Sequence, residues 1–228
     1  MGFESIKLSR TAKAVVEKWA KVQPGENVCI VTDTNKLSIA EALADACYAV
    51  GAETVICIMT PRRTHGDDPP KVVGAAMAAA NVVFAPISYS IGHTEARHAA
   101  VRAGARFYMM REVTEGSFTS GAIAADPDEI YALNRRMIED LKDTKRIRMV
   151  TDLGSDISMS VEGRPPVDLV ARLHGGLTLP SGEVPFCPIE GTANGVAVFD
   201  HGMDGVGLLK EPVKVTVKDG HIVKIEGG

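Results

Sequence analysis

The sequence predicts an α/β protein with a mainly parallel, doubly wound sheet followed by a smaller β-rich unit. Short apolar runs, suited to strands buried on both faces, alternate with helical stretches as far as about residue 151. Glycine-rich turns then replace the helices, and residues 152–228 hold 13 of the 22 glycines. We therefore expect an α/β domain over residues 1–151 and a β-rich unit over residues 152–228.

Periodicity places the elements of the first domain. Helical spacing of apolar residues predicts helices over 8–22, 37–50, 70–80, 94–103 and 126–141. Continuous apolar runs predict strands over 27–32, 54–59, 81–85, 106–110 and 146–151. Asp33-Thr34-Asn35 can cap the helix that follows, and Gly51 ends it. Strands that alternate with helices in this way form parallel sheets.

The sequence of the second unit predicts short strands joined by turns. Strand candidates cover 157–161, 196–199, 213–217 and 222–225. The last two are joined through Asp219-Gly220, a dipeptide that favours a tight hairpin. We therefore expect the sequence to end in a β-hairpin.

Charge and hydropathy exclude two classes of partner. The formal net charge is -4 and the isoelectric point is near 5.9, whereas nucleic acids and anionic membranes require a basic face. The longest apolar runs, such as 82–87 and 75–80, are far shorter than the roughly 20 residues of a membrane span. The first ten residues also lack the apolar core of a secretory signal. We expect a cytoplasmic protein.

The four cysteines have neither CxxC spacing nor a repeated framework, so we interpret them as reduced residues, mostly in the core. They are Cys29, Cys47, Cys57 and Cys187. A proline-flanked loop could present Cys187 as a nucleophile, but no base lies near it in the sequence.

A polar loop follows the apolar run 81–85 and contains the first group of candidate site residues. Loops at the carboxyl ends of parallel strands hold the ligands of α/β proteins, which places His93 at the mouth of a site. His93 would act there as a general base or bind substrate, and the alternative is a residue that only closes the turn. Ser90 or Thr94 can cap the next helix, whose N–H groups favour an anion. Arg97 can bind substrate, although a salt bridge or a solvated position is commoner.

A second loop, over residues 179–195, surrounds two carboxylates with turn-forming residues. Proline and glycine on both sides can hold Glu183 rigidly, as an acid/base residue or a ligand of a substrate amine requires. Glu190 follows in the same loop. From the residues alone, a surface loop with two solvated glutamates is the favoured interpretation.

Signals for a metal or a nucleotide are weak. Asp152 and Asp156 could bind a divalent cation, but carboxylates in such loops more often accept loop N–H groups. The other histidines show neither HxxxH nor HxD spacing; they are His65, His98, His174, His201 and His221. The motifs GxGxxG after the first strand, GxxxxGK[ST] and GxSxG are absent, which removes support for nucleotide binding and serine hydrolysis.

Several segments in order resemble one known family. They are PGENVCIVTDT, ALADACYAVGAETVICIMTPRR, SIGHTEARHAAVRAGARFYMM, DLGSDISM, LPSGEVPFCPIEGTANGVAVFD and VTVKDGHIVKIEGG. Together they are similar to the aminopeptidase T-like family, which joins the M29 metallo-aminopeptidases to the 2,5-dihydroxypyridine 5,6-dioxygenases. The resemblance runs from about residue 10 to residue 228. It implies a homo-oligomer, a small-molecule or short peptide substrate, and a divalent metal (Zn, Mn, Co or Fe).

The resemblance also implies roles for single residues. His93 matches the histidine that faces the substrate in the dioxygenase branch, and Glu183 looks like the Gly-Glu-Val loop of the aminopeptidase branch. We therefore expect His93 and Glu183 to be catalytic. The expected substrate-binding residues are Ser90, Thr94, Arg97 and Glu190. The family's metal ligands lie beyond the segment similar to 218–228, so no metal ligand is assigned here.

Three functions follow as hypotheses. The first is a metal-dependent hydrolase resembling leucyl aminopeptidases, which acts on a peptide or a related small amide. The second is an Fe(II)-dependent ring-cleaving dioxygenase, with His93 as the base that deprotonates a hydroxylated heteroaromatic ring. The third is a catalytically incomplete binding or assembly domain, because the metal-bearing region is expected after the last residue of this sequence.

Overall fold

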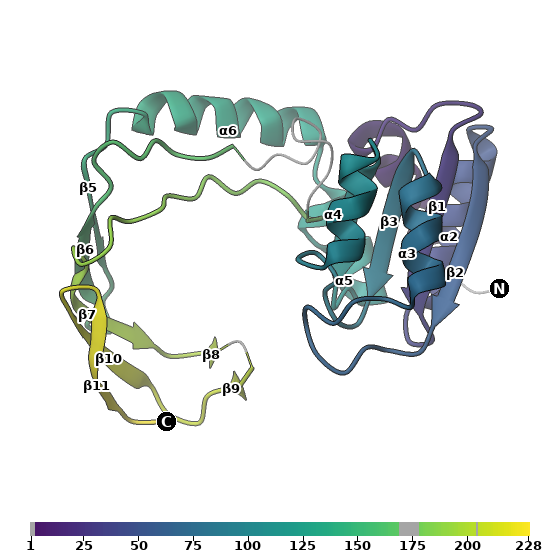
Figure 1. Cartoon of the computed structure of the whole chain (residues 1–228). Helices are drawn as coiled ribbons and strands as arrows, with labels where there is room; N and C mark the ends of the chain where they lie inside the picture. The colour runs from purple at the N-terminus through teal and green to yellow at the C-terminus, as the bar shows by residue number, and fades with distance from the viewer. Residues whose placement is uncertain (1–2, 169–177, 204) are drawn as a thin grey trace. The chain divides into compact units, whose positions relative to one another are not determined.

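The computed structural model describes residues 3–168, 178–203 and 205–228, which form two compact units (Figure 1). The first unit comprises the described residues 3–134 and 178–183, and the second comprises 135–168, 184–203 and 205–228. The first holds a parallel sheet flanked by helices and the second an antiparallel sheet, which confirms the predicted fold class. None of the helices within the described ranges has both the length and the apolar character of a membrane span.

The sheet of the first unit has four strands in the order β2-β1-β3-β4. Their bounds are β1 (Asn27–Asp33), β2 (Glu53–Met59), β3 (Val82–Ile87) and β4 (Arg106–Arg111). All three pairings are parallel. Beside β4, Thr178 forms an isolated parallel bridge with Met109, and the Leu179 N–H donates to the Met109 carbonyl at 2.7 Å.

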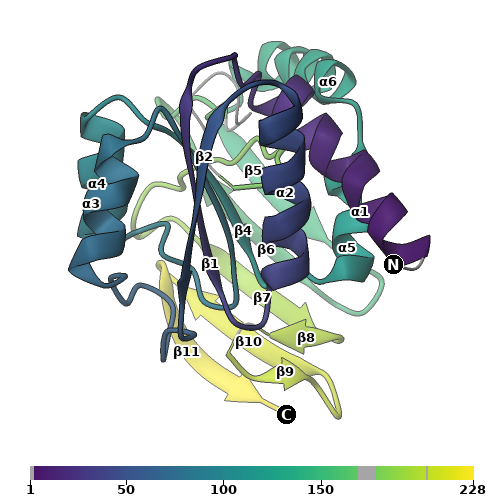
Figure 2. The ribbon, with the colours of Figure 1, turned by 90° about the vertical axis from the view of Figure 1, so that its right-hand side faces the viewer.

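Helices cover both faces of this sheet (Figure 2). One face carries α1 (Phe3–Ala14), the π-helical turn η1 (Val15–Trp19), α2 (Leu37–Ala49) and α5 (Glu115–Ser120), and the other carries α3 (Lys71–Ala79) and α4 (Glu95–Arg102). Alternate strand residues divide between two cores, so that Val28 and Ile30 pack in the first while Cys29 and Val31 pack in the second. This division explains the continuous apolar runs of the strands.

The second unit contains a five-stranded antiparallel sheet in the order β11-β10-β7-β6-β5. Its strands are β5 (Arg146–Val150), β6 (Asp156–Ser160), β7 (Asn194–Phe199), β10 (Val213–Lys218) and β11 (His221–Glu226). A two-stranded ribbon pairs β8 (Gly202–Met203) with β9 (Gly207–Leu208). Asp219 and Gly220 have positive φ angles of 49° and 76°, which confirms the hairpin signal.

The boundary between the units differs from the expected one at residue 151. It falls between Asn134 and Arg135, within α6 (Pro127–Leu141), and the described residues 178–183 return to the first unit. The strand β5 pairs antiparallel with β6 and does not join the parallel sheet. The reason lies in its composition, because arginines alternate with Ile147 and Met149 and the strand is mostly exposed. The short elements α5, η2 (Ala122–Ala124), β8 and β9 were not predicted.

Candidate functional site

A cavity of about 190 Å³ lies in the first unit between the loop after β3 and the α4-covered face of β4. Its lining consists of Ser90, Gly92, His93, Arg97, Phe107, Met109 and Thr178. Phe107 and Met109 are 1% and 2% exposed and supply apolar walls. Ser90 and Arg97 are half-buried and His93 is exposed. The structure therefore brings three of the predicted site residues together around one small cavity.

Thr94 holds the first turn of α4 in place beside this cavity. Its hydroxyl donates to the Ile91 carbonyl at 2.7 Å and accepts the Arg97 N–H at 3.3 Å, which confirms the predicted cap. Asp68 accepts the Ala96 N–H at 3.0 Å. The Thr94 side chain is only 2% exposed, so it acts by placing Arg97. Two of the helix N–H groups that we expected to attract an anion are already bonded to side chains.

His65, which the sequence did not single out, fixes the main chain at Ser90. The Ser90 N–H donates to His65 Nδ1 at 3.0 Å, and the Gly66 N–H donates to the Ser90 carbonyl at 2.8 Å. The His65 ring also lies edge-on to Tyr89, with centroids 5.4 Å apart and an interplanar angle of 64°. Because Nδ1 is the acceptor, the hydrogen-bond pattern assigns the proton of the neutral ring to Nε2.

Asp33 connects the ends of β1 and β3, where the strand order reverses. Its carboxylate is buried and accepts the Ser88 N–H at 2.6 Å, the Ser88 hydroxyl at 3.1 Å and the Asn35 N–H at 3.0 Å. The expectation that this segment caps α2 is wrong, because the N-cap residue is Lys36 and no side chain caps the helix. Ligands of α/β proteins commonly bind at such a reversal, but here a polar network occupies it.

Neither glutamate of the second loop is among the residues that line the cavity. Glu183 is exposed, and its carbonyl accepts from Asn134 Nδ2 at 3.2 Å. Glu190 belongs to the second unit and accepts two hydrogen bonds from Arg164, at 3.2 and 2.6 Å. That guanidinium holds the pKa of Glu190 below its ordinary value. The roles expected for both residues stay predictions.

The described residues contain no cluster of three or more His, Cys, Asp or Glu side chains that could hold a metal ion. Asp156 pairs with Arg148 through two hydrogen bonds of 2.7 and 2.6 Å. Asp152 is exposed, and His174 lies outside the described residues. The residues that the structure describes therefore do not fit the divalent metal that the resemblance implies.

The cysteines divide by burial. Cys29 and Cys47 are buried as predicted, Cys57 is half-buried and Cys187 is exposed, and all four thiols are free. Cys187 belongs to the second unit, whereas the cavity beside His93 lies in the first.

Comparisons with known proteins agree with this architecture. The family model of 2,5-dihydroxypyridine 5,6-dioxygenase matches residues 8–228. The solved structure of 2,5-dihydroxypyridine dioxygenase from Pseudomonas putida is similar with a TM-score of 0.76 and 18% identity, over 98% of this chain and 69% of that one. AmpT from Thermus thermophilus is similar with a TM-score of 0.68 and 15% identity, over 97% of this chain and 71% of that one.

No curated protein matches the sequence. At 15% and 18% identity the two solved structures show the shared fold, whereas the family model covers nearly the whole chain. The chain therefore belongs to the 2,5-dihydroxypyridine 5,6-dioxygenase family.

Proposed function

We propose that the cavity beside His93 binds a single-ring, hydroxylated nitrogen heteroaromatic compound, as the substrate of an oxygen-dependent ring cleavage. The observation that carries this proposal is the placement of Ser90, His93 and Arg97 around apolar walls from β4. The volume of about 190 Å³ is below the roughly 300–1,000 Å³ of sites for larger ligands, and it suits one ring. The family model supports ring cleavage over hydrolysis.

His93 and Arg97 have distinct parts in the proposed reaction. The exposed imidazole of His93 accepts the proton of a ring hydroxyl, and the resulting anion is more electron-rich than the neutral ring. Arg97 stabilises that anion with its guanidinium, which lies 3.4 Å from His98 Nδ1. Phe107 and Met109 exclude water from one side of the ring.

The dioxygenase branch of the family resemblance implies Fe(II), and the hydrolase branch implies a divalent ion. The described residues do not supply a ligand set for either ion. The residues of this cavity bind the ring, orient it and remove one proton.

Hydrolysis of a small amide or of an N-terminal residue is the second candidate function. It is supported by the likeness to AmpT and by the exposed carboxylate of Glu183, which could bind a substrate amine. Ring cleavage in the cavity beside His93 gives no part to Glu183, which does not line that cavity.

Calorimetric titration under argon distinguishes the two functions. We expect saturable binding of 2,5-dihydroxypyridine, and affinities at least about tenfold weaker for pyridine and for leucinamide, because neither offers a ring hydroxyl to His93. Tighter binding of leucinamide than of 2,5-dihydroxypyridine would favour the hydrolase. Equal affinities for pyridine and its dihydroxy derivative would overturn the proposed role of the hydroxyl.

A further inference from the structure

Two cysteine thiols are in contact in the second core of the first unit. Cys29 Sγ on β1 lies 3.8 Å from Cys57 Sγ on β2. Cys29 is in register with Val55, and Cys57 with Val31, so the two cysteines are diagonal neighbours on one face of the sheet. They belong to different strands, 28 positions apart in the sequence.

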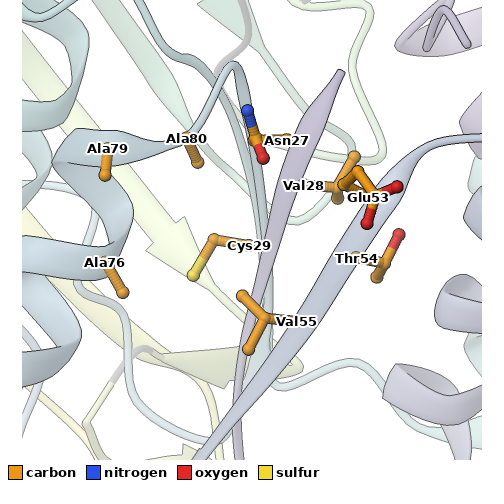
Figure 3. Close-up of a pocket in the computed structure, with 9 residues that line it drawn as sticks. All are labelled: Asn27, Val28, Cys29, Glu53, Thr54, Val55, Ala76, Ala79 and Ala80. Atoms are coloured by element: carbon orange, nitrogen blue, oxygen red, sulfur yellow. The ribbon is translucent and has the colours of Figure 1, made fainter. Parts of the chain in front are cut away.

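A separate cavity of about 340 Å³ reaches Cys29, one member of this pair (Figure 3). Cys29 and Val55 face it from the strands, while Ala76, Ala79 and Ala80 line it from the side of α3. The alanines leave the space open because their side chains end at one methyl group. Cys57 is half-buried on the edge strand β2, whereas only 1% of Cys29 is exposed. A small solute can therefore meet Cys57 at the partly exposed edge strand, while Cys29 borders the cavity on the side of α3.

We propose that Cys29 and Cys57 form a reversible disulfide when hydrogen peroxide reaches the pair. In the first step the Cys57 thiolate attacks the peroxide, which gives Cys57 sulfenic acid and hydroxide. In the second step the Cys29 sulfur attacks the sulfenic sulfur, the S–S bond forms, and the departing hydroxyl takes up the Cys29 proton and leaves as water. The hydroxide of the first step combines with the proton that Cys57 lost, so that two thiols are oxidised, one peroxide is reduced, and two water molecules form.

The order of these steps follows from the different surroundings of the two thiols. Cys57 is the more accessible one and meets the oxidant first. Burial, with a smaller contribution from Cys57, raises the pKa of Cys29 to about 12. Cys29 therefore remains a thiol until the sulfenic acid forms beside it.

The geometry predicts a strained bond. A disulfide requires a sulfur separation of about 2.05 Å, so the gap of 3.8 Å must close. Diagonal neighbours in a sheet lie about 7–8 Å apart, beyond the usual Cα separation of about 4.4–6.8 Å in disulfides. The strand β2 can shift because β1 is its only neighbour in the described sheet. Such strain makes the bond easy to reduce.

Peptide mapping of the 228-residue chain tests the proposal. The reduced chain is treated with hydrogen peroxide, its remaining thiols are alkylated in denaturant, and the digest is analysed by mass spectrometry. We expect one linked pair of peptides containing Cys29 and Cys57, and a fall from four free thiols to two. Dithiothreitol should restore all four.

Cys47 provides the matched control, because it is as buried as Cys29 and burial also raises its pKa to about 12. The variant Cys47→Ser should form the linked peptides as the native chain does, and Cys57→Ser should keep Cys29 as a free thiol. Alkylation of both Cys29 and Cys57 after oxidation, or linkage of Cys29 to Cys47 or Cys187, would overturn the proposal.

Discussion

His65 shows how one side chain outside the cavity can control the residues within it. Its Nδ1 atom accepts the Ser90 N–H, so a residue at position 65 needs an acceptor in the same place to keep the loop that carries His93 in position. A phenylalanine preserves the ring that contacts Tyr89 and removes the acceptor, whereas the side-chain oxygen of an asparagine can replace it.

We therefore expect His65→Phe to weaken binding of 2,5-dihydroxypyridine by roughly fivefold, which corresponds to one net hydrogen bond of about 1 kcal/mol. His65→Asn should bind within about twofold of the native chain. Calorimetry measures both affinities. Native affinity in the phenylalanine variant would show that this hydrogen bond does not position the site.

The ion pair between Glu26 and Arg106 predicts part of the response to acid. Arg106 donates to Glu26 at 2.9 and 2.8 Å, and its hydrogen bonds hold the pKa of Glu26 below the ordinary value of 4.5. The carboxylate of Glu26 therefore binds a proton more readily in the unfolded chain than in the folded chain. The stabilisation is present above about pH 4.5 and is lost as the pH falls through the lower, folded pKa.

Replacement of Glu26 by Gln should lower the free energy of unfolding at pH 7 by about 1–2 kcal/mol and should flatten its dependence on pH below 4.5. Urea unfolding at a series of pH values measures both effects. Glu139→Gln, in the exposed pair with Lys142, should change the stability little. An equal loss of stability in the two variants would contradict the account.

At the residue scale, part of the lining of the candidate cavity could be predicted from the sequence. Ser90, His93 and Arg97 could be predicted because they follow a recognisable strand within one short loop. The contacts of His65 and Asp33 could not, because they join segments 25 and 55 positions apart. Such contacts depend on strand order, which local patterns do not specify.

At the scale of elements, Gly195 is required where β7 passes β6. It has a φ angle of 133°, and a Cβ atom there would lie 2.1 Å from the Asp156 carbonyl oxygen. Gly154 also has a positive φ angle, of 99°, but a Cβ atom there would meet nothing within 4 Å. The two glycines therefore separate the cost of the backbone angle from the cost of the clash.

Gly195→Ala should lower the free energy of unfolding of the second unit by about 1–3 kcal/mol more than Gly154→Ala does. Hydrogen exchange of the amides of β6 and β7 measures the local stability directly. Equal protection in the two variants would show that the strands can move apart without cost.

Elements with a continuous apolar run or a regular helical period could be predicted, and the others could not. The four strands of the parallel sheet and the helices α2, α3 and α4 fall close to their expected positions, because burial leaves a clear apolar pattern. The first helix begins at Phe3, five residues before its predicted start. The strand β5 was assigned to the wrong sheet because a short apolar run does not determine which strand it pairs with. Two-residue strands such as β8 carry no period at all.

At the scale of the whole molecule, fold and family are established more firmly than activity. Solved structures of a dioxygenase and of AmpT share this fold at 18% and 15% identity, so the fold cannot decide between their reactions. Under the proposed function, the side chains of the small cavity beside His93 decide between the two reactions. The homo-oligomer implied by the family resemblance stays a prediction, which light scattering on the purified chain measures.

The most direct test of the proposed function is an anaerobic absorption titration of 2,5-dihydroxypyridine into the native chain, His93→Gln and the control His221→Gln in β11. We predict that the native chain and the control bind the ring in its ionised form, because His93 accepts the hydroxyl proton. His93→Gln should bind the neutral ring, at least about tenfold more weakly. An unchanged spectrum and affinity in His93→Gln would contradict the claim that this cavity binds and deprotonates the ring.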